Sequence, residues 1–78
     1  MQEHETIEQT VRSLWLKTLG SSDIPPDTNF FEAGGDSLAA VMLLTGILEE
    51  FDVALDPATF FASPTVPEMT EMIVAELR

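Results

Sequence analysis

The first apolar pattern along the chain is helical. Ile7, Val11 and Leu14 recur three or four positions apart, which predicts an amphipathic helix over 6–19. Thr6 is followed three positions later by glutamine, which is the spacing of a capping box. We therefore expect this helix to begin beside Thr6 and to stop before the glycine that follows the pattern.

Three further helices are predicted, over 38–51, 57–61 and 66–77. The first of them follows Asp36 and Ser37, which are both favourable N-cap residues. The second opens at Pro57, because proline at the first helical position gives up no needed donor. The third follows Thr65, which forms a capping box with the glutamate three positions later. The pattern thus predicts a small all-α bundle of three main helices and one short helix.

A long connection over 20–35 separates the first two helices. Its paired prolines and paired glycines are incompatible with a long helix. Ile24, Phe30 and Phe31 are nevertheless too apolar for a free linker. We expect at least one of the phenylalanines to fold back onto the core, which would make this loop packed rather than disordered.

The helix predicted over 38–51 has two apolar arcs on its wheel instead of one. The first arc is the obvious core face: Ala40, Leu43, Leu44, Ile47 and Phe51. The second lies on another side, with Leu48 at the junction between the two: Leu38, Val41, Met42 and Thr45. Either this helix is central and buried almost all round, or the second arc is an exposed docking surface. The pattern alone favours burial, whereas so thin a bundle favours docking.

Composition excludes several classes of function. The chain has 78 residues, which allows a single domain over 1–78, and 45% of them are apolar, which supports a compact core. The absence of cysteine, with His4 as the only histidine, excludes thiolate and histidine-rich metal sites. A net charge of −11 argues against binding nucleic acid or anionic membranes and favours partners with basic patches. No apolar stretch approaches the roughly 20 residues of a membrane span, so we expect a cytoplasmic setting.

The residues around Ser37 are unusual for a helix N-cap. The paired Gly34 and Gly35 leave its hydroxyl uncrowded, and a helix N-terminus is a favourable place for a phosphate group. A cap remains the ordinary interpretation for such a serine.

The tetrapeptide over 35–38 is also the signature of GDSL esterases. A serine nucleophile needs a general base, however, and His4 belongs to no motif, so we reject the esterase interpretation.

The ten residues 29–38 read NFFEAGGDSL and closely resemble the phosphopantetheine attachment motif of carrier proteins. The variant is similar to that of the peptidyl carrier proteins, or thiolation domains, of nonribosomal peptide synthetases. The segments 14–20 and 61–66 resemble the first helix and the entry to the last helix of that family. The resemblance spans nearly the whole chain in the right order, and it implies the four-helix bundle of acyl carriers.

The resemblance also implies a function. Ser37, flanked by the motif residues Asp36 and Leu38, would accept 4′-phosphopantetheine from coenzyme A through a separate phosphopantetheinyl transferase. The thiol of the arm would carry an amino-acyl or peptidyl group as a thioester between adenylation and condensation or tailoring enzymes. The chain itself would be a non-catalytic monomer. The partner-facing residues would be Leu38, Val41, Met42, Thr45 and Leu48, with Phe60 as a weaker candidate.

One difference from fatty-acid carriers indicates the expected subclass of carrier, and two alternative functions stay open. Fatty-acid carriers have acidic residues where Ala39, Met42 and Leu48 stand, so docking here should be more hydrophobic and less sensitive to salt. The chain could instead be a polyketide or other acyl carrier protein. It could also be an unmodified helical adaptor that docks through the helix over 38–51.

Overall fold

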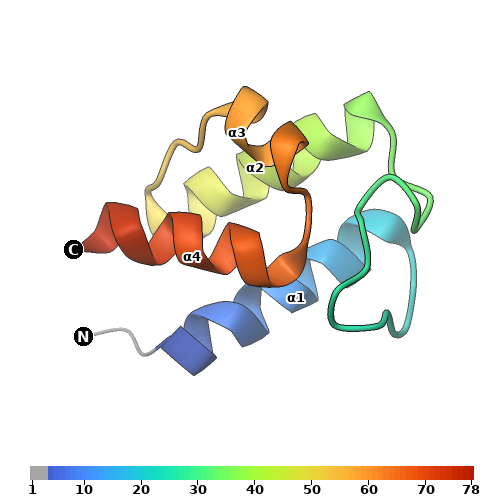
Figure 1. The fold of residues 1–78 in the computed structure, drawn as a ribbon, viewed down its shortest axis with the longest axis horizontal. Helices are drawn as coiled ribbons and strands as arrows, with labels where there is room; N and C mark the ends of the chain where they lie inside the picture. Colours follow the sequence, from blue (N-terminus) through green and yellow to red (C-terminus); the bar gives the residue numbers. More distant parts are fainter. Residues whose placement is uncertain (1–3) are drawn as a thin grey trace.

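A computed structural model describes residues 4–78 of the chain (Figure 1). This part of the chain contains four helices and no strand: α1 (His4–Leu19), α2 (Ser37–Phe51), α3 (Pro57–Ala62) and α4 (Val66–Leu77). The predicted all-α bundle of three main helices and one short helix is therefore confirmed. Of the helices described, none combines the length and the apolar character that crossing a membrane requires.

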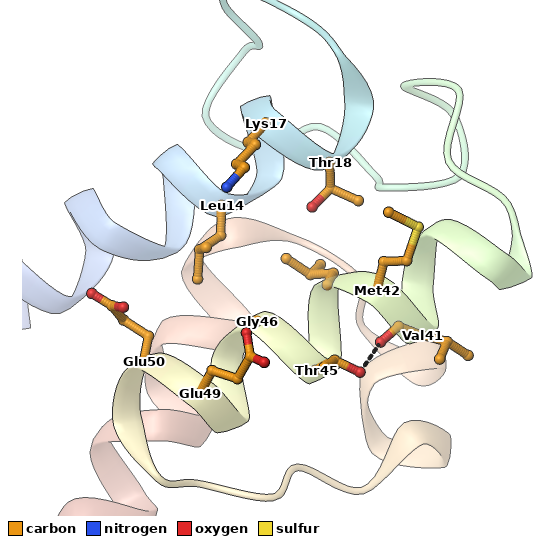
Figure 2. A pocket seen from close by; sticks show the side chains of 10 residues that line it. Leu14, Lys17, Thr18, Val41, Met42, Thr45, Gly46, Glu49 and Glu50 are labelled. Carbon is orange, nitrogen blue, oxygen red and sulfur yellow. Dashed lines mark hydrogen bonds between the residues drawn. The ribbon is translucent and has the colours of Figure 1, made fainter.

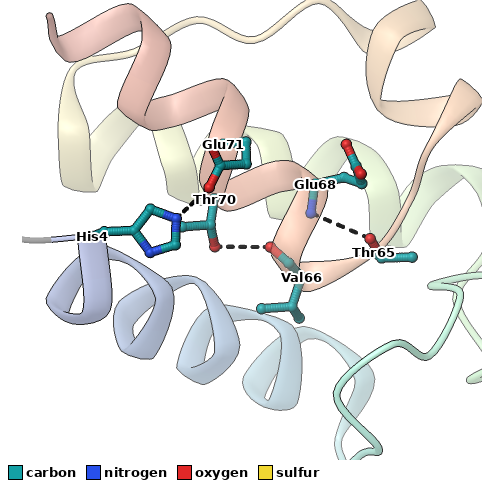
Figure 3. Close-up of polar contacts among 6 residues, drawn as sticks. All are labelled: His4, Thr65, Val66, Glu68, Thr70 and Glu71. Atoms are coloured by element: carbon teal, nitrogen blue, oxygen red, sulfur yellow. Dashed lines mark hydrogen bonds and ion pairs between the residues drawn. The ribbon is translucent and has the colours of Figure 1, made fainter.

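The start of α1 differs from the sequence prediction. The helix begins at His4, so Thr6 lies inside its first turn and does not cap it. His4 pairs with Glu71 of α4 (Figure 3), and Thr10 donates a hydrogen bond to the Thr6 carbonyl. The contact with α4 holds a first turn that local capping signals alone would place later. The predicted capping box at Thr6 is therefore wrong.

The other helix starts are fixed by side-chain caps. The Asp36 carboxylate accepts from the Ala39 N–H at 2.8 Å, and Asp56 accepts from the Ala58 N–H at 3.1 Å. The Thr65 hydroxyl accepts from the Glu68 N–H at 3.3 Å (Figure 3), which confirms one half of the second capping box. The other half is not formed, because the Thr65 N–H donates to the Ser63 carbonyl at 3.0 Å. Each of these contacts satisfies a donor that would otherwise be orphaned at a helix start.

The core is built around three aromatic rings that come from three different segments. Trp15 of α1 meets Phe30 of the loop edge-to-face with ring centroids 5.1 Å apart, and Phe60 of α3 at 6.3 Å. Phe30 and Phe60 lie 5.6 Å apart. The Trp15 indole N–H also donates to the Met69 sulfur of α4 at 3.4 Å. These three rings, all fully buried, join α1, the loop and α3, and the sulfur contact adds α4.

The connection between α1 and α2 is packed, as predicted. Ile24 and Phe30 are buried, and the Phe30 N–H donates to the Pro64 carbonyl at 2.8 Å. Arg12 of α1 holds the early loop through the Asp23 carboxylate and the Ile24 carbonyl. A Cβ at Gly35 would overlap the Phe30 ring, so a glycine is required just before α2 begins. The loop therefore sets the position of the start of α2.

Candidate functional site

Ser37 is the first residue of α2, and its side chain is exposed. The cap of the helix is Asp36, with extended backbone angles and its carboxylate on the Ala39 N–H. The Ser37 hydroxyl has no hydrogen-bond partner among residues 4–78. The ordinary interpretation of Ser37 as the cap is therefore wrong, because Asp36 takes that role. The hydroxyl is left free for chemistry with another molecule.

The surroundings of Ser37 suit a covalently attached anion. Helix N-termini carry a partial positive charge and unpaired backbone donors, and both favour a phosphate group. Gly34, at a φ of 106°, has open space where a side chain would stand, so the approach past the preceding turn is uncrowded. Asp36 opposes an added negative charge, but its carboxylate is engaged with the Ala39 amide. The helix N-terminus thus favours a phosphate group, while the charge of Asp36 opposes it.

The second apolar arc of α2 lies on the surface. We call it the exposed stripe: Leu38, Val41, Met42, Thr45 and Leu48. Leu38, at 69% exposed, directly follows Ser37, and Leu48, at 45%, is the least exposed of the four apolar members. The opposite face of α2 is buried through Ala40, Leu43 and Ile47. Of the two interpretations left open by the sequence, the one in which α2 is buried almost all round is wrong.

Phe60 does not belong to this surface. Its ring is fully buried against Trp15 and Phe30, so it is not accessible to a partner in this structure. Its neighbour Phe61 is 46% exposed and packs on Phe31, with ring centroids 5.6 Å apart. Adjacent helical residues point about 100° apart, so only one of the two can face the core. Phe60 is therefore wrong as a partner-facing candidate, and Phe61, which the sequence reasoning did not single out, is the exposed ring of the two.

The one histidine of the chain does not lie near Ser37. His4 opens α1, and Figure 1 places the starts of α1 and α2 at opposite ends of the molecule. Among residues 4–78, no group of three or more metal-ligating side chains could hold a metal ion. What the site does present is an exposed hydroxyl at a capped helix end, followed by an apolar surface.

A family model described as a phosphopantetheine attachment site matches residues 9–73. The chain belongs to this family. The match includes Ser37 and the whole of the exposed stripe, and it confirms the resemblance to carrier proteins. Phosphopantetheine is thus the cofactor of the family, and the free hydroxyl at the start of α2 fits its attachment.

Two relatives are large synthases, and this chain matches a short segment of each. Surfactin synthase subunit 2 of Bacillus subtilis is 35% identical over 69 residues, which are 88% of this chain and 2% of that protein. Polyketide synthase PksN of the same organism is 38% identical over 68 residues, which are 87% of this chain and 1% of that protein. The chain therefore spans no more than 2% of the length of these relatives.

A solved structure shows the same fold in a complex. The complex contains the phosphopantetheine transferase Sfp, coenzyme A and a peptidyl carrier protein. One of its chains superposes on this family member with a TM-score of 0.85 and 29% sequence identity, covering 88% of this chain and 90% of that one. The acyl-carrier bundle predicted from the sequence is thus confirmed.

Proposed function

We propose that the chain acts as one carrier domain, with Ser37 as the attachment point of the arm and an amino-acyl or peptidyl group as its cargo. The observation that carries this proposal is the Ser37 hydroxyl, exposed and unpaired within residues 4–78 because Asp36 takes the role of the cap. When bound, the arm supplies a thiol on which cargo is held as a thioester. A flexible tether raises the effective concentration of the cargo at each partner without tight binding.

In this proposal the chain is a substrate of a separate phosphopantetheinyl transferase and catalyses nothing itself. The serine oxygen bonds to the phosphorus that bears pantetheine in coenzyme A, and adenosine 3′,5′-bisphosphate leaves. The serine proton must go to a base. Because His4 lies at the far end of the molecule, we assign that base to the transferase.

The test is enzymatic loading followed by mass spectrometry of the intact protein. Incubation with coenzyme A and a broad-specificity phosphopantetheinyl transferase is expected to add the mass of one arm per chain. Peptide mapping should then place the addition on Ser37. A wild-type chain that gains no mass would favour the alternative of an unmodified helical adaptor that docks through α2.

A second candidate differs only in the cargo. The 38% identity to a polyketide synthase segment favours a carrier of polyketide or other acyl groups. Incubation of the loaded protein with amino-acid-adenylating enzymes and with acyltransferases would separate the two. Acceptance of amino acids alone supports the peptidyl carrier, and acceptance of acyl groups alone supports the second candidate.

We propose that the exposed stripe is the face that meets the transferase and the loading enzymes. Met42→Glu is expected to slow loading by the transferase at least several-fold, because it puts a charge into an apolar contact. Folding stability should change by no more than about 0.5 kcal/mol, since Met42 is 57% exposed. Initial rates of mass gain and a thermal melt measure the two effects.

The matched control for this change is Leu77→Glu. Leu77 lies on α4 and is 43% exposed, so the same gain of charge falls away from the stripe. It should leave the loading rate unchanged. Loss of cooperative unfolding in Met42→Glu would instead show that Met42 belongs to the core. Equal loading rates for Met42→Glu and Leu77→Glu would show that the transferase does not bind the exposed stripe.

A further inference from the structure

A groove with a cavity volume of about 520 Å³ runs between α1 and α2 (Figure 2). Lys17 and Thr18 extend into it from α1, and Met42 extends from α2. Its size lies within the range of sites for small molecules, about 300–1,000 Å³. Three residues of the exposed stripe line the groove, Val41, Met42 and Thr45, and they lie on the helix that starts at Ser37. A group tethered to Ser37 would therefore lie near this groove.

Gly46 is the first sign that the groove is used. Glycine inside a helix is unfavourable relative to alanine, so a reason for it is needed. A Cβ at this position would meet only the Leu14 side chain, at 3.5 Å, which is an ordinary contact. The packing of α1 on α2 therefore does not require a glycine. Gly46 lines the groove, so the missing side chain leaves space there.

The charged residues that line the groove indicate the chemical class of its ligand. Glu49 and Glu50 line one end, and Lys17, the only lysine of the chain, lines the α1 side. Within residues 4–78, Lys17 forms no ion pair, so its ammonium is available to a ligand. An amino-acyl group carries groups of the complementary kinds, namely an ammonium, a carbonyl oxygen and a side chain. The carboxylates would receive the ammonium, and Lys17 would donate to the carbonyl oxygen.

A second, smaller groove on the other side of the stripe lacks this chemistry. It lies between α2 and the segment that leads into α3, and Leu44, Leu48 and Leu55 line it together with other uncharged residues. No charged side chain lines it, so the ammonium of an amino-acyl group would lose water there without compensation. A plain acyl chain would find it suitable. The two grooves therefore differ in the class of cargo that they complement.

The tether makes weak binding sufficient. Met42 lies five residues and Glu49 twelve residues after Ser37, which is about 7.5 Å and about 18 Å along a helix. A short flexible tether gives an effective concentration in the millimolar range, so a dissociation constant of about 1 mM would already hold the cargo for a large part of the time. Binding this weak would still release the cargo to a partner enzyme.

We propose that the groove between α1 and α2 is a resting site for the cargo, selective for amino-acyl groups with a free α-ammonium and an aliphatic side chain. This proposal rests on the attachment of the arm to Ser37. It assigns Gly46 to leaving space in the groove, Glu49 and Glu50 to the ammonium, and Lys17 to the carbonyl oxygen.

The test compares two cargoes that differ only in the amine. The transferase loads wild-type protein with pantetheine arms that carry leucyl or 4-methylpentanoyl groups, joined as stable amides in place of thioesters. Backbone amide shifts are measured by NMR against the arm alone, below the α-amino pKa of about 7.7–8.0. Leucyl is expected to shift the amides of Thr18, Thr45, Gly46 and Glu49. The 4-methylpentanoyl group should shift them by less than half as much.

Two sets of variants test the carboxylates of the groove and the open space at Gly46 separately. The pair Glu49→Gln and Glu50→Gln should remove the difference between the two cargoes. The matched pair Glu68→Gln and Glu76→Gln, which makes the same charge change on exposed positions of α4, should keep it. Gly46→Leu should abolish the leucyl shifts, with a thermal melt to check that the variant is folded.

Several results would overturn the resting site. They are equal shifts for both cargoes, shifts confined to Leu44, Leu48 and Leu55, or shifts confined to the neighbours of Ser37. Loading is followed by mass in the same samples. A chain that cannot be loaded would overturn the attachment and the resting site together, whereas loading without leucyl-specific shifts would overturn the resting site alone.

Discussion

Ser37→Ala is expected to abolish loading by a phosphopantetheinyl transferase completely while leaving the fold intact. The hydroxyl is the only group removed, and in the proposed function it is the atom that bonds to phosphorus. Folding should be almost unaffected because Asp36, and not Ser37, caps α2. Intact-protein mass after incubation with coenzyme A reports the loading, and a thermal melt reports the fold.

Two control variants make this result specific. Ser13→Ala removes an exposed hydroxyl from α1 and should load like the wild type. Asp36→Ala removes the cap and should cost about 0.5–2 kcal/mol of folding free energy. A Ser37→Ala protein that still gains an arm would place the attachment elsewhere. One that loses as much stability as Asp36→Ala would return Ser37 to a capping role.

Trp15→Ala is expected to remove a large part of the stability of the protein. A buried tryptophan replaced by alanine costs about 3–5 kcal/mol. A chain of this length has a total of about 4–12 kcal/mol, at about 0.05–0.15 kcal/mol per residue. The change leaves a cavity against Phe30 and Phe60 and removes the donor that faces the Met69 sulfur. Urea unfolding followed by circular dichroism measures the loss.

The control for the cavity is a large apolar residue on the surface. Leu38→Ala removes an apolar side chain that is 69% exposed, so its effect on stability should stay within about 0.5 kcal/mol. A Trp15→Ala protein that unfolds at the wild-type urea concentration would contradict the central role of the aromatic cluster. It would mean that Phe30 and Phe60 move to fill the cavity that the indole leaves.

The four helices could be predicted from the sequence because local signals and the apolar period agree. Thr65 caps α4 as its spacing predicts, and Pro57 opens α3. The start of α1 could not be predicted in the same way. The first turn is held by the pair of His4 with Glu71, which are 67 positions apart in the chain. No local pattern contains a contact of that kind.

The sequence names the residues proposed for the site but does not contain their geometry. The motif identifies Ser37, yet the choice of cap between Asp36 and Ser37 depends on which backbone turns helical first. The exposure of the stripe depends on what packs beside α2, which a helical wheel does not contain. Phe60 was misplaced for a similar reason. The orientation of α3 decides which of two adjacent phenylalanines faces inward, and only the fold sets that orientation.

The buried indole gives the protein a fluorescence reporter of its own. Trp15 is the only tryptophan, and the chain has no tyrosine, so emission excited at the red edge of the absorption band comes from one ring. That ring touches the α1–α2 loop, α3 and α4 through Phe30, Phe60 and Met69. Opening of any of these three segments would bring water to the indole and move its emission to longer wavelength. The integrity of the loop that positions Ser37 can thus be followed in solution without a label.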